Sequence, residues 1–398
     1  MTRIILKKGR DESLRRFHPW VFSGAIAQIN GTPSEGDVVS VYAADGSFLA
    51  IGHYQIGSIA VRILSFEADT LPADFWEVML GRALNERRTL CLASGNGMTN
   101  CYRLVHGEGD GLPGLVVDYY DGVCVMQAHS VGMFRAKKQI CDALQKVYGE
   151  TLKAVYDKSS GTAPFKAGLD LVDGYLFRRD GFADEQQLVL ENGHKFLVNW
   201  TEGQKTGFFL DQRENRASVG RYAAGKRVLN LFCYTGGFSI YALKAGALSV
   251  DSVDSSSKAM SLVDRNVELN GFDTTRHTSY CTDAIEFLKN APEDKYDLII
   301  VDPPAFAKHR GVLGNALRAY QRLNAAAISK VAPGGLVFTF SCSQVVDKEA
   351  FALAVFSAAA QTGRSVRILD RFNQPADHPV SIYHPEGEYL KGLLLYVE

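Results

Sequence analysis

The stretch Val228–Asp254 constrains the fold more than any other part of this chain. It opens with a short, mostly apolar run, Val228–Phe232, of the kind that forms a buried strand. Thr235-Gly236-Gly237 breaks this run where a strand must turn into a helix. Apolar residues then recur at helical spacing up to a stop at Gly246, and a second strand ends at Asp254. The pattern predicts a βαβ unit and therefore an α/β domain with a parallel sheet.

The glycines of this unit indicate the kind of ligand that it accepts. A phosphate-binding turn has the pattern G-x-G-x-x-G at a helix N-terminus, whereas this chain has only Gly236-Gly237, between Tyr234 and Phe238. Asp254 follows about 20 residues later, where an acid can accept the hydroxyl hydrogens of a ribose. We therefore expect a nucleoside cofactor without phosphate, of which S-adenosylmethionine (SAM) is the commonest. The alternative is a structural βαβ unit without a ligand.

Composition describes an ordinary globular protein. The chain has 398 residues, which suggests two or three domains. Its seven cysteines are scattered without a C-x-x-C pair, so we expect neither a disulfide framework nor a metal site. The first twenty residues lack the apolar core of a signal peptide, and no apolar run reaches membrane-spanning length. These features predict a cytoplasmic protein that has no membrane partner.

The chain divides into three parts on its pattern of strands and helices. Closely spaced short strands in residues 1–70 predict a small β-barrel. The barrel's sequence, with His18-Pro19-Trp20 followed by Glu35-Gly36-Asp37, resembles a PUA domain, an RNA-binding barrel. Residues 74–198 combine helices and strands in a small α+β domain, and residues 199–398 continue the βα alternation as a doubly wound sheet.

Charge near the N-terminus offers a candidate RNA contact. The net charge of the chain is −1, which gives no overall basic field. Residues 1–20 are nevertheless basic, and Lys7, Lys8 and Arg10 form a patch that can hold phosphates. An exposed charged tail is the alternative interpretation.

Polar residues follow several strands of the predicted C-terminal sheet. Gly236-Gly237, Asp254, Asp283, Asp302 and Cys342 all come at strand C-termini, where ligands bind in sheets of this kind. Asp283 stands where an acid can receive an adenine amino group, although a helix N-cap explains it nearly as well. The convergence predicts one cleft lined by these side chains.

A segment before the βαβ unit, GQKTGFFLDQREN, fits neither strand nor helix periodicity. It carries Phe208-Phe209-Leu210, which a surface loop rarely exposes, so we expect part of it to close over the cofactor. A helix that joins two domains and begins near Asp211 is an equally good interpretation.

The run Asp302-Pro303-Pro304-Ala305-Phe306 ends the next buried strand. Two prolines remove two backbone donors and leave carbonyl acceptors, which suits an exocyclic amine. Phe306 offers a face on which a flipped base can stack, and Asp302 can bind a ring nitrogen or an amino hydrogen. A rigid strand exit without a role in substrate binding is the alternative.

Cys342 separates two kinds of chemistry. Carbon 5 of cytosine is too weak a nucleophile to attack a methyl sulfonium directly, so a thiolate must first add to carbon 6. Cys342 ends a strand, between two serines, and we place it one strand from Asp302. Packing as a small buried residue is the other interpretation of this cysteine.

Taken together, these motifs resemble a known family. The runs NLFCYTGGF, VDSS, VDPPAF, TFSCS and GQKTGFFLDQR, with Asp377-His378-Pro379-Val380 and Tyr389-Leu390-Lys391-Gly392 near the C-terminus, resemble PUA-domain class I methyltransferases that make 5-methylcytosine in bacterial large-subunit ribosomal RNA. The resemblance covers the whole chain. It implies a PUA barrel, a small α+β middle domain and a Rossmann-like catalytic domain with a seven-stranded, doubly wound sheet.

The resemblance also implies roles for individual residues. Cys342 is the expected nucleophile and Asp302 steadies the base, with Pro303, Pro304 and Phe306 around it and Lys7, Lys8 and Arg10 on the RNA. The expected SAM contacts are Gln204, Phe208, Asp211, Arg213, Asn230, Phe232, Tyr234, Gly236, Gly237, Asp254, Asp283, Ala284 and Asp302. Large-subunit ribosomal RNA is the expected partner, and a homodimer is an option that the sequence does not decide.

Two positions depart from the family's pattern. Many RNA cytosine-C5 methyltransferases carry a second cysteine directly after the proline of the Asp302 motif, where this chain has Pro304, and relatives often have a lysine at Ala305. The sequence therefore assigns no group to remove the carbon-5 proton. Methylation of an exocyclic amine or of guanine, with Cys342 as packing, and a non-catalytic RNA-binding assembly factor are the two alternative functions.

Overall fold

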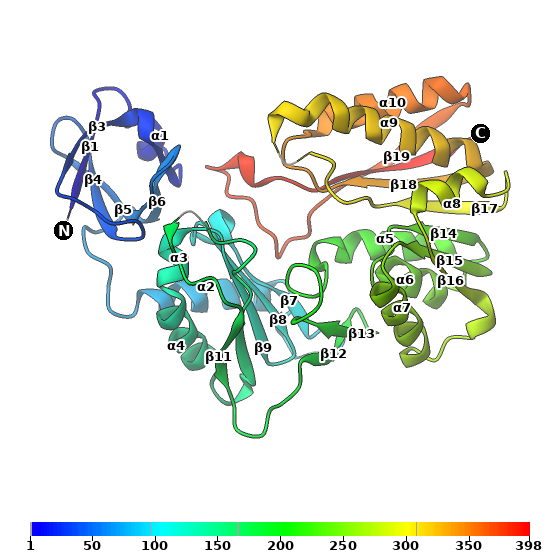
Figure 1. Ribbon diagram of the computed structural model, residues 1–398, viewed down its shortest axis with the longest axis horizontal. Helices are drawn as coiled ribbons and strands as arrows, with labels where there is room; N and C mark the ends of the chain where they lie inside the picture. Colours follow the sequence, from blue (N-terminus) through cyan, green and yellow to red (C-terminus); the bar gives the residue numbers. More distant parts are fainter. Residues whose placement is uncertain (1, 96, 165–166, 308) are drawn as a thin grey trace. The chain divides into compact units, whose positions relative to one another are not determined.

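The computed structural model describes residues 2–95, 97–164, 167–307 and 309–398 (Figure 1). Contacts divide the chain into two compact units. The first comprises Met1–Val189, Val198–Leu210 and Ala376–Gly387, and the second comprises Leu190–Leu197, Asp211–Pro375 and Glu388–Glu398. Among the described residues, no helix combines the length and the apolar character needed to cross a membrane. The predicted three-domain boundaries stay a prediction.

The first unit begins with a six-stranded sheet in the order β2-β6-β5-β4-β1-β3. Alternating apolar side chains of these strands, such as Ile4, Val39 and Val61, fill one core. The predicted strands are confirmed, but β3 was missed because its sequence, IAQIN, has too few apolar residues to stand out. The elements are β1 (Arg3–Leu6), α1 (Glu12–Arg15), β2 (Trp20–Phe22), β3 (Ile26–Asn30), β4 (Val38–Tyr42), β5 (Phe48–Tyr54) and β6 (Ile59–Ser65).

A five-stranded sheet in the order β11-β10-β9-β8-β7 follows in the same unit. Helices α2 and α4 pack against each other and share a core with this sheet, which confirms the predicted α+β character. Its elements are α2 (Phe75–Thr89), β7 (Cys101–His106), β8 (Leu115–Tyr120), β9 (Val123–Ala128), α3 (Val131–Arg135), α4 (Lys137–Tyr148), β10 (Ala154–Asp157) and β11 (Gly174–Arg178). A two-stranded sheet, β12 (Gln186–Glu191) and β13 (His194–Asn199), comes next.

The segment Ala376–Gly387 returns from the C-terminal part of the sequence to the first unit. Buried Arg87 holds it there, because its guanidinium bonds both carboxylate oxygens of Asp110, at 2.5 and 2.8 Å, and donates to the Asp377 carbonyl at 2.9 Å. The Asp377 carboxylate in turn accepts the backbone N–H of Arg103 at 3.0 Å. A fully paired buried network of this kind fixes the path of the segment.

The second unit contains a seven-stranded sheet in the order β16-β15-β14-β17-β18-β20-β19. Strands β14 to β18 are parallel to one another, and β20 is antiparallel to both β18 and β19. The predicted doubly wound sheet is confirmed. Its strands are β14 (Arg227–Leu231), β15 (Ser249–Asp254), β16 (His277–Cys281), β17 (Tyr296–Val301), β18 (Val331–Ser341), β19 (Val366–Asn373) and β20 (Lys391–Val397).

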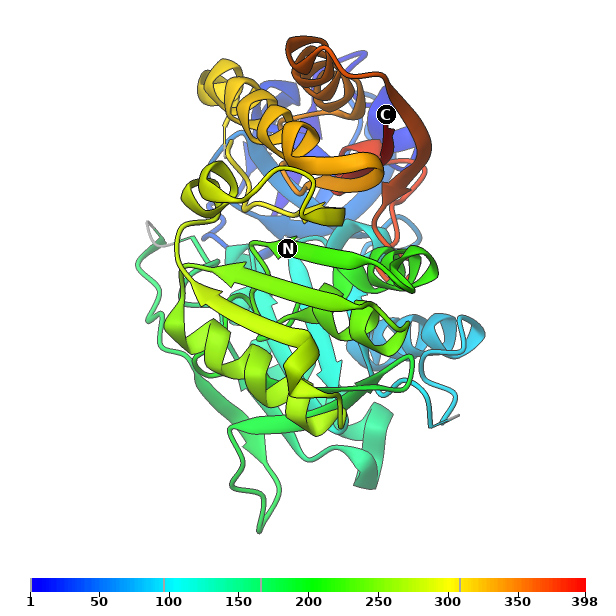
Figure 2. The ribbon, with the colours of Figure 1, turned by 90° about the vertical axis from the view of Figure 1, so that its right-hand side faces the viewer.

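Helices cover both faces of this sheet (Figures 1 and 2). Because both faces are covered, the central strand β17 is continuously apolar from Leu298 to Val301, and these residues are fully buried. Strand order reverses between β14 and β17, the place where ligands bind in doubly wound sheets. The helices are α5 (Arg213–Ala223), α6 (Gly237–Lys244), α7 (Ser257–Leu269), α8 (Ala284–Asn290), α9 (Leu313–Lys330) and α10 (Lys348–Thr362).

Candidate active site

The loop between β14 and α6 has an unusual backbone. Phe232 and Tyr234 adopt φ values of 57° and 48°, and Gly236 has φ 78°. Residues other than glycine rarely adopt this left-handed backbone conformation. Backbone strain of this kind concentrates at functional sites. A Cβ atom on Gly236 would also lie 2.9 Å from a methyl group of Val263. Glycine is therefore required at this position, and the loop is held close to the strand ends.

Asp254 connects this loop to the next strand. Its Oδ2 accepts the backbone N–H of Tyr234 at 3.0 Å, and its Oδ1 accepts that of Ser256 at 2.9 Å. The carboxylate is half-buried at the end of β15. Each oxygen of a carboxylate has two acceptor positions, so both oxygens keep capacity for another donor. The predicted contact of Asp254 with the ribose of the cofactor stays a prediction.

Asp283 performs the alternative role that the sequence suggested. Its Oδ1 accepts the backbone N–H groups of Ile285 and Glu286, both at 2.9 Å, and so caps α8. The side chain is exposed, one strand away from Asp254, while Ala284 is buried in the first turn of α8. Capping uses only one of the two carboxylate oxygens of Asp283. The predicted contact of Asp283 with the cofactor stays a prediction.

Asn230 is fully buried in β14. Its amide donates to Ser239 Oγ at 2.8 Å, and a chain of short contacts continues through Ser252 to His277 Nε2. No hydrogen bond reaches Asn230 Oδ1 from the part of the chain that the structure describes. The side chain thus organises strands behind the loop, and the predicted cofactor contact of Asn230 stays a prediction. We call the loops after β14, β15 and β16 the β14–β16 edge.

The loops after β17 and β18 form a second group, which we call the β17–β18 edge. The two strands are neighbours, with Val301 opposite Thr339, so Asp302 and Cys342 leave the same end of the sheet. Ser343 Oγ donates to the Ala307 carbonyl at 2.7 Å and ties the two loops together. Asp302 and Cys342 are half-buried. The predicted convergence of these residues at one end of the sheet agrees with this topology.

Within the Asp302 loop, Pro303 is buried, Pro304 is exposed and Phe306 is half-buried. The ring of Phe306 packs against Tyr320 of α9 with a centroid separation of 4.8 Å. Tyr320 is fully buried, and its hydroxyl oxygen accepts a hydrogen bond from Ser341 Oγ at 2.8 Å. Tyr320 therefore contacts the Asp302 loop through Phe306 and the start of the Cys342 loop through Ser341.

Burial raises the pKa of Tyr320 to about 12, and the negative charges of Cys342 and Asp302 act in the same direction. The hydroxyl consequently stays protonated at neutral pH. Sequence reasoning missed this residue, because a tyrosine at a helical spacing looks like ordinary core.

Lys391 is a second residue that carries no predicted role. It begins β20 directly opposite Ser341 and is only 4% exposed. Its Nζ donates to the carbonyls of Ser343 at 2.6 Å and Val346 at 2.5 Å. Burial lowers the pKa of Lys391 to about 8, and the nearby Cys342 opposes this shift. A lysine in the otherwise apolar run KGLLLYV was the available signal.

The remaining predicted residues belong to other places in the fold. Gln204 is exposed and Phe208 buried in the first unit, where Lys7, Lys8 and Arg10 are exposed near β1. Asp211 and Arg213 are buried in the second unit, where Asp211 Oδ2 accepts the Tyr389 hydroxyl at 2.7 Å. Helix α5 begins at Arg213, as the alternative interpretation of this segment expected. Closure of Gln204–Arg213 over a cofactor stays a prediction.

Comparison with known proteins identifies the family. Residues 103–395 match the S-adenosylmethionine-dependent methyltransferase family, and residues 4–66 match a PUA-like domain. The chain belongs to the SAM-dependent methyltransferases. It is 40% identical to a protein of Aeromonas hydrophila named ribosomal RNA large subunit methyltransferase I, over 98% of each chain.

Solved structures agree on the fold of this methyltransferase. A candidate SAM-dependent methyltransferase from Streptococcus mutans is 24% identical, covers 100% of both chains and superposes with a TM-score of 0.83. A second methyltransferase structure, a complex with S-adenosylhomocysteine (SAH), has a TM-score of 0.85 at the same identity and coverage. The predicted class I fold with a PUA-like domain is confirmed, and SAM is the cofactor of the methyltransferase.

Proposed function

We propose that this methyltransferase methylates carbon 5 of a cytosine in large-subunit ribosomal RNA, through a covalent adduct with Cys342. The RNA substrate is inferred from the name of the full-length relatives and from the PUA-like domain. Exposed Lys7, Lys8 and Arg10 supply positive charge in that domain for RNA phosphates.

One observation carries the assignment of chemistry. The loop that bears Asp302 and the loop that bears Cys342 are fastened to each other, by Ser343 Oγ on the Ala307 carbonyl and by the shared support of Tyr320. A nucleophile and a base-binding acid that act on one pyrimidine must keep a fixed separation. This pair of ties supports a joint role of the two loops better than separate packing roles.

The proposed sequence of bonds is short. The Cys342 thiolate adds to carbon 6 of the cytosine, and the electron density that this addition places on carbon 5 makes that carbon nucleophilic. SAM supplies an electrophilic methyl group, which carbon 5 takes, and SAH is left. Water or a basic side chain takes the carbon-5 proton, and the electron pair of that bond expels the Cys342 sulfur from carbon 6, which restores the aromatic ring and the thiolate.

Residues around the nucleophile support these steps. The Asp302 carboxylate accepts from the amino group of the base or, when protonated, donates to its ring nitrogen. The carbonyls around Pro303 and Pro304 accept from the amino group, and Phe306 stacks on the ring. The Lys391 ammonium lies near Cys342 and favours the thiolate by its positive charge. On the other edge, Asp254 accepts the ribose hydroxyls of SAM.

The test is nucleoside mass spectrometry of large-subunit ribosomal RNA incubated with the protein and methyl-labelled SAM. We expect labelled 5-methylcytosine with the wild type and none with Cys342→Ala. Cys281→Ala is the matched control, because Cys281 also ends a strand of the same sheet but is exposed on the β14–β16 edge, and it should retain activity.

The other outcomes point to the alternative functions. Label in a methylated guanine or adenine, undiminished in Cys342→Ala, would replace cytosine chemistry by direct methylation of nitrogen. Failure of the wild type to bind SAM in calorimetry would instead favour an RNA-binding assembly factor.

A further inference from the structure

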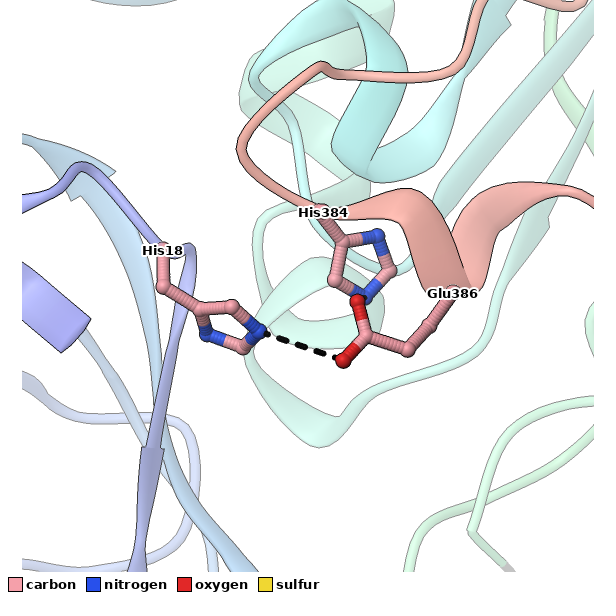
Figure 3. Close-up of side chains that lie close together, drawn as sticks. All are labelled: His18, His384 and Glu386. Atoms are coloured by element: carbon pink, nitrogen blue, oxygen red, sulfur yellow. Dashed lines mark ion pairs between the residues drawn. The ribbon is translucent and has the colours of Figure 1, made fainter.

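Three side chains outside the methyltransferase site meet in the first unit (Figure 3). His18 lies between α1 and β2, whereas His384 and Glu386 lie in the returning segment, at the 3-10 turn Pro385–Gly387. One ligand atom from each of the three lies within 4.8 Å of the others. His18 Nε2 is 3.7 Å from one Glu386 oxygen, and His384 Nε2 is 3.9 Å from the other.

His384 is the unusual member of this group. It is 2% exposed, and neither ring nitrogen has a hydrogen-bond partner in the described part of the chain. Buried polar groups without a partner are rare and call for a ligand or an ordered water. Burial also lowers the pKa of His384. The Trp20 indole packs edge-on against the His384 ring, with 4.3 Å between the ring centroids.

His18 is already held in an orientation that suits a ligand. Its Nε2 points toward Glu386 (Figure 3), while its Nδ1 accepts the Trp20 backbone N–H at 3.2 Å and lies 3.4 Å from the Trp20 carbonyl. A metal at Nε2 requires the tautomer in which Nδ1 is protonated and donates to the Trp20 carbonyl. Glu108, which accepts the Trp20 indole N–H at 2.8 Å, adds a negative charge that acts on His384.

We propose that His18, His384 and Glu386 bind a divalent transition-metal ion such as Zn²⁺. Two imidazoles and one carboxylate are a common ligand set for this class of ion. Ligand atoms about 2.1 Å from a tetrahedral ion are roughly 3.4 Å apart, so the observed separations, which reach up to 4.8 Å, must contract when the ion binds. The ion fastens the segment Ala376–Gly387 to the PUA-like domain, independently of methyl transfer.

The test uses the full-length protein, stripped with a chelator, reduced and titrated with Zn²⁺ by calorimetry and with Co²⁺ by visible absorption. We expect one equivalent of metal, the strong absorption of tetrahedral Co²⁺, and a higher melting temperature with Zn²⁺. Affinity should fall at least a hundredfold in His384→Ala and at least tenfold in Glu386→Gln.

Glu388→Gln is the matched control. Glu388 lies two residues further on and pairs with Lys348 at 2.5 Å, so its variant should bind metal like the wild type. Glu386 is exposed, so Glu386→Gln should fold even where His384→Ala does not. Absence of stoichiometric binding, or binding that all variants share through the seven cysteines, would overturn the proposal.

Discussion

At the β14–β16 edge, polar groups are held by hydrogen bonds to backbone N–H groups close by in the chain, whereas at the β17–β18 edge they are held by side chains from distant segments. Asp254 and Asp283 accept from Ser256 and Ile285, each two residues away, and Asp254 also accepts from Tyr234, 20 residues away in the same βαβ unit. Ser343 instead contacts Ala307, 36 residues away, and Lys391, 48 residues away. The first edge is a local motif, and the second is a product of the whole sheet.

This difference has a consequence for function. A site for a common cofactor is specified by a short stretch of chain, because glycine, the strand end and the acid lie within one βαβ unit. The groups that would act on a particular base come from β17, β18, α9 and β20, so their geometry depends on packing across the sheet. We expect variants at the two edges to separate cofactor binding from methyl transfer.

The largest effect is expected at Lys391, as a change of stability with pH. Because burial lowers its pKa from 10.5 to about 8, the folded protein binds fewer protons than the unfolded chain between these pH values. The free energy of unfolding therefore rises with pH in that window, by up to about 3 kcal/mol. Buried Cys124, Cys233 and Tyr296, whose pKa values burial raises, act in the opposite direction. The measurement is therefore the difference in free energy of unfolding between the wild type and Lys391→Met, from urea unfolding at pH 7 to 10.5, and this difference should rise with pH.

Lys348→Met is the control for this prediction. The Lys348 side chain is 52% exposed, so its removal should leave the pH dependence of the wild type in place. A wild type and a Lys391→Met variant with parallel stability curves would show that Lys391 does not link the β17–β18 edge to pH.

A smaller effect is expected on the β14–β16 edge. Asp254→Ala removes the acceptor of two backbone N–H groups and of the ribose hydroxyls, so the Kd for SAM should rise about thirtyfold, or about 2 kcal/mol. Calorimetry with SAM measures it. Asp273→Ala is the matched control, because Asp273 also accepts a backbone N–H, that of Thr275 at 2.9 Å, but at an exposed turn before β16. Equal losses in both variants would remove Asp254 from the cofactor site.

The same contrast explains how much the sequence could predict. The βαβ unit, the cap at Asp283 and the doubly wound sheet follow from local patterns, and the structure contains them. Tyr320 and Lys391 were missed because only folding brings them to Cys342. His18 and His384 come from opposite ends of the chain, so no ligand spacing signalled them, and the expectation of no metal site rested on cysteines alone.

The smallest effect is expected at Tyr320, where it most directly tests the separation of the two edges. Tyr320→Phe leaves the Ser341 hydroxyl buried without its acceptor, which should cost about 1 kcal/mol of stability. The ring and its contact with Phe306 remain, so the Cys342 loop should loosen without collapse. Methyl transfer measured in single turnover should fall several-fold, while the Kd for SAM stays unchanged.

Tyr280→Phe on β16 supplies the comparison for Tyr320→Phe. Its ring packs on Phe287 at 4.7 Å, beside the β14–β16 edge, so the rate of methyl transfer at saturating SAM should match the wild type. If Tyr320→Phe weakened SAM binding as much as it slowed transfer, the two edges would be one cooperative site. If only transfer slowed, α9 would be the element that holds the nucleophile and the base-binding loop in register, because Tyr320 is the side chain through which this helix reaches both.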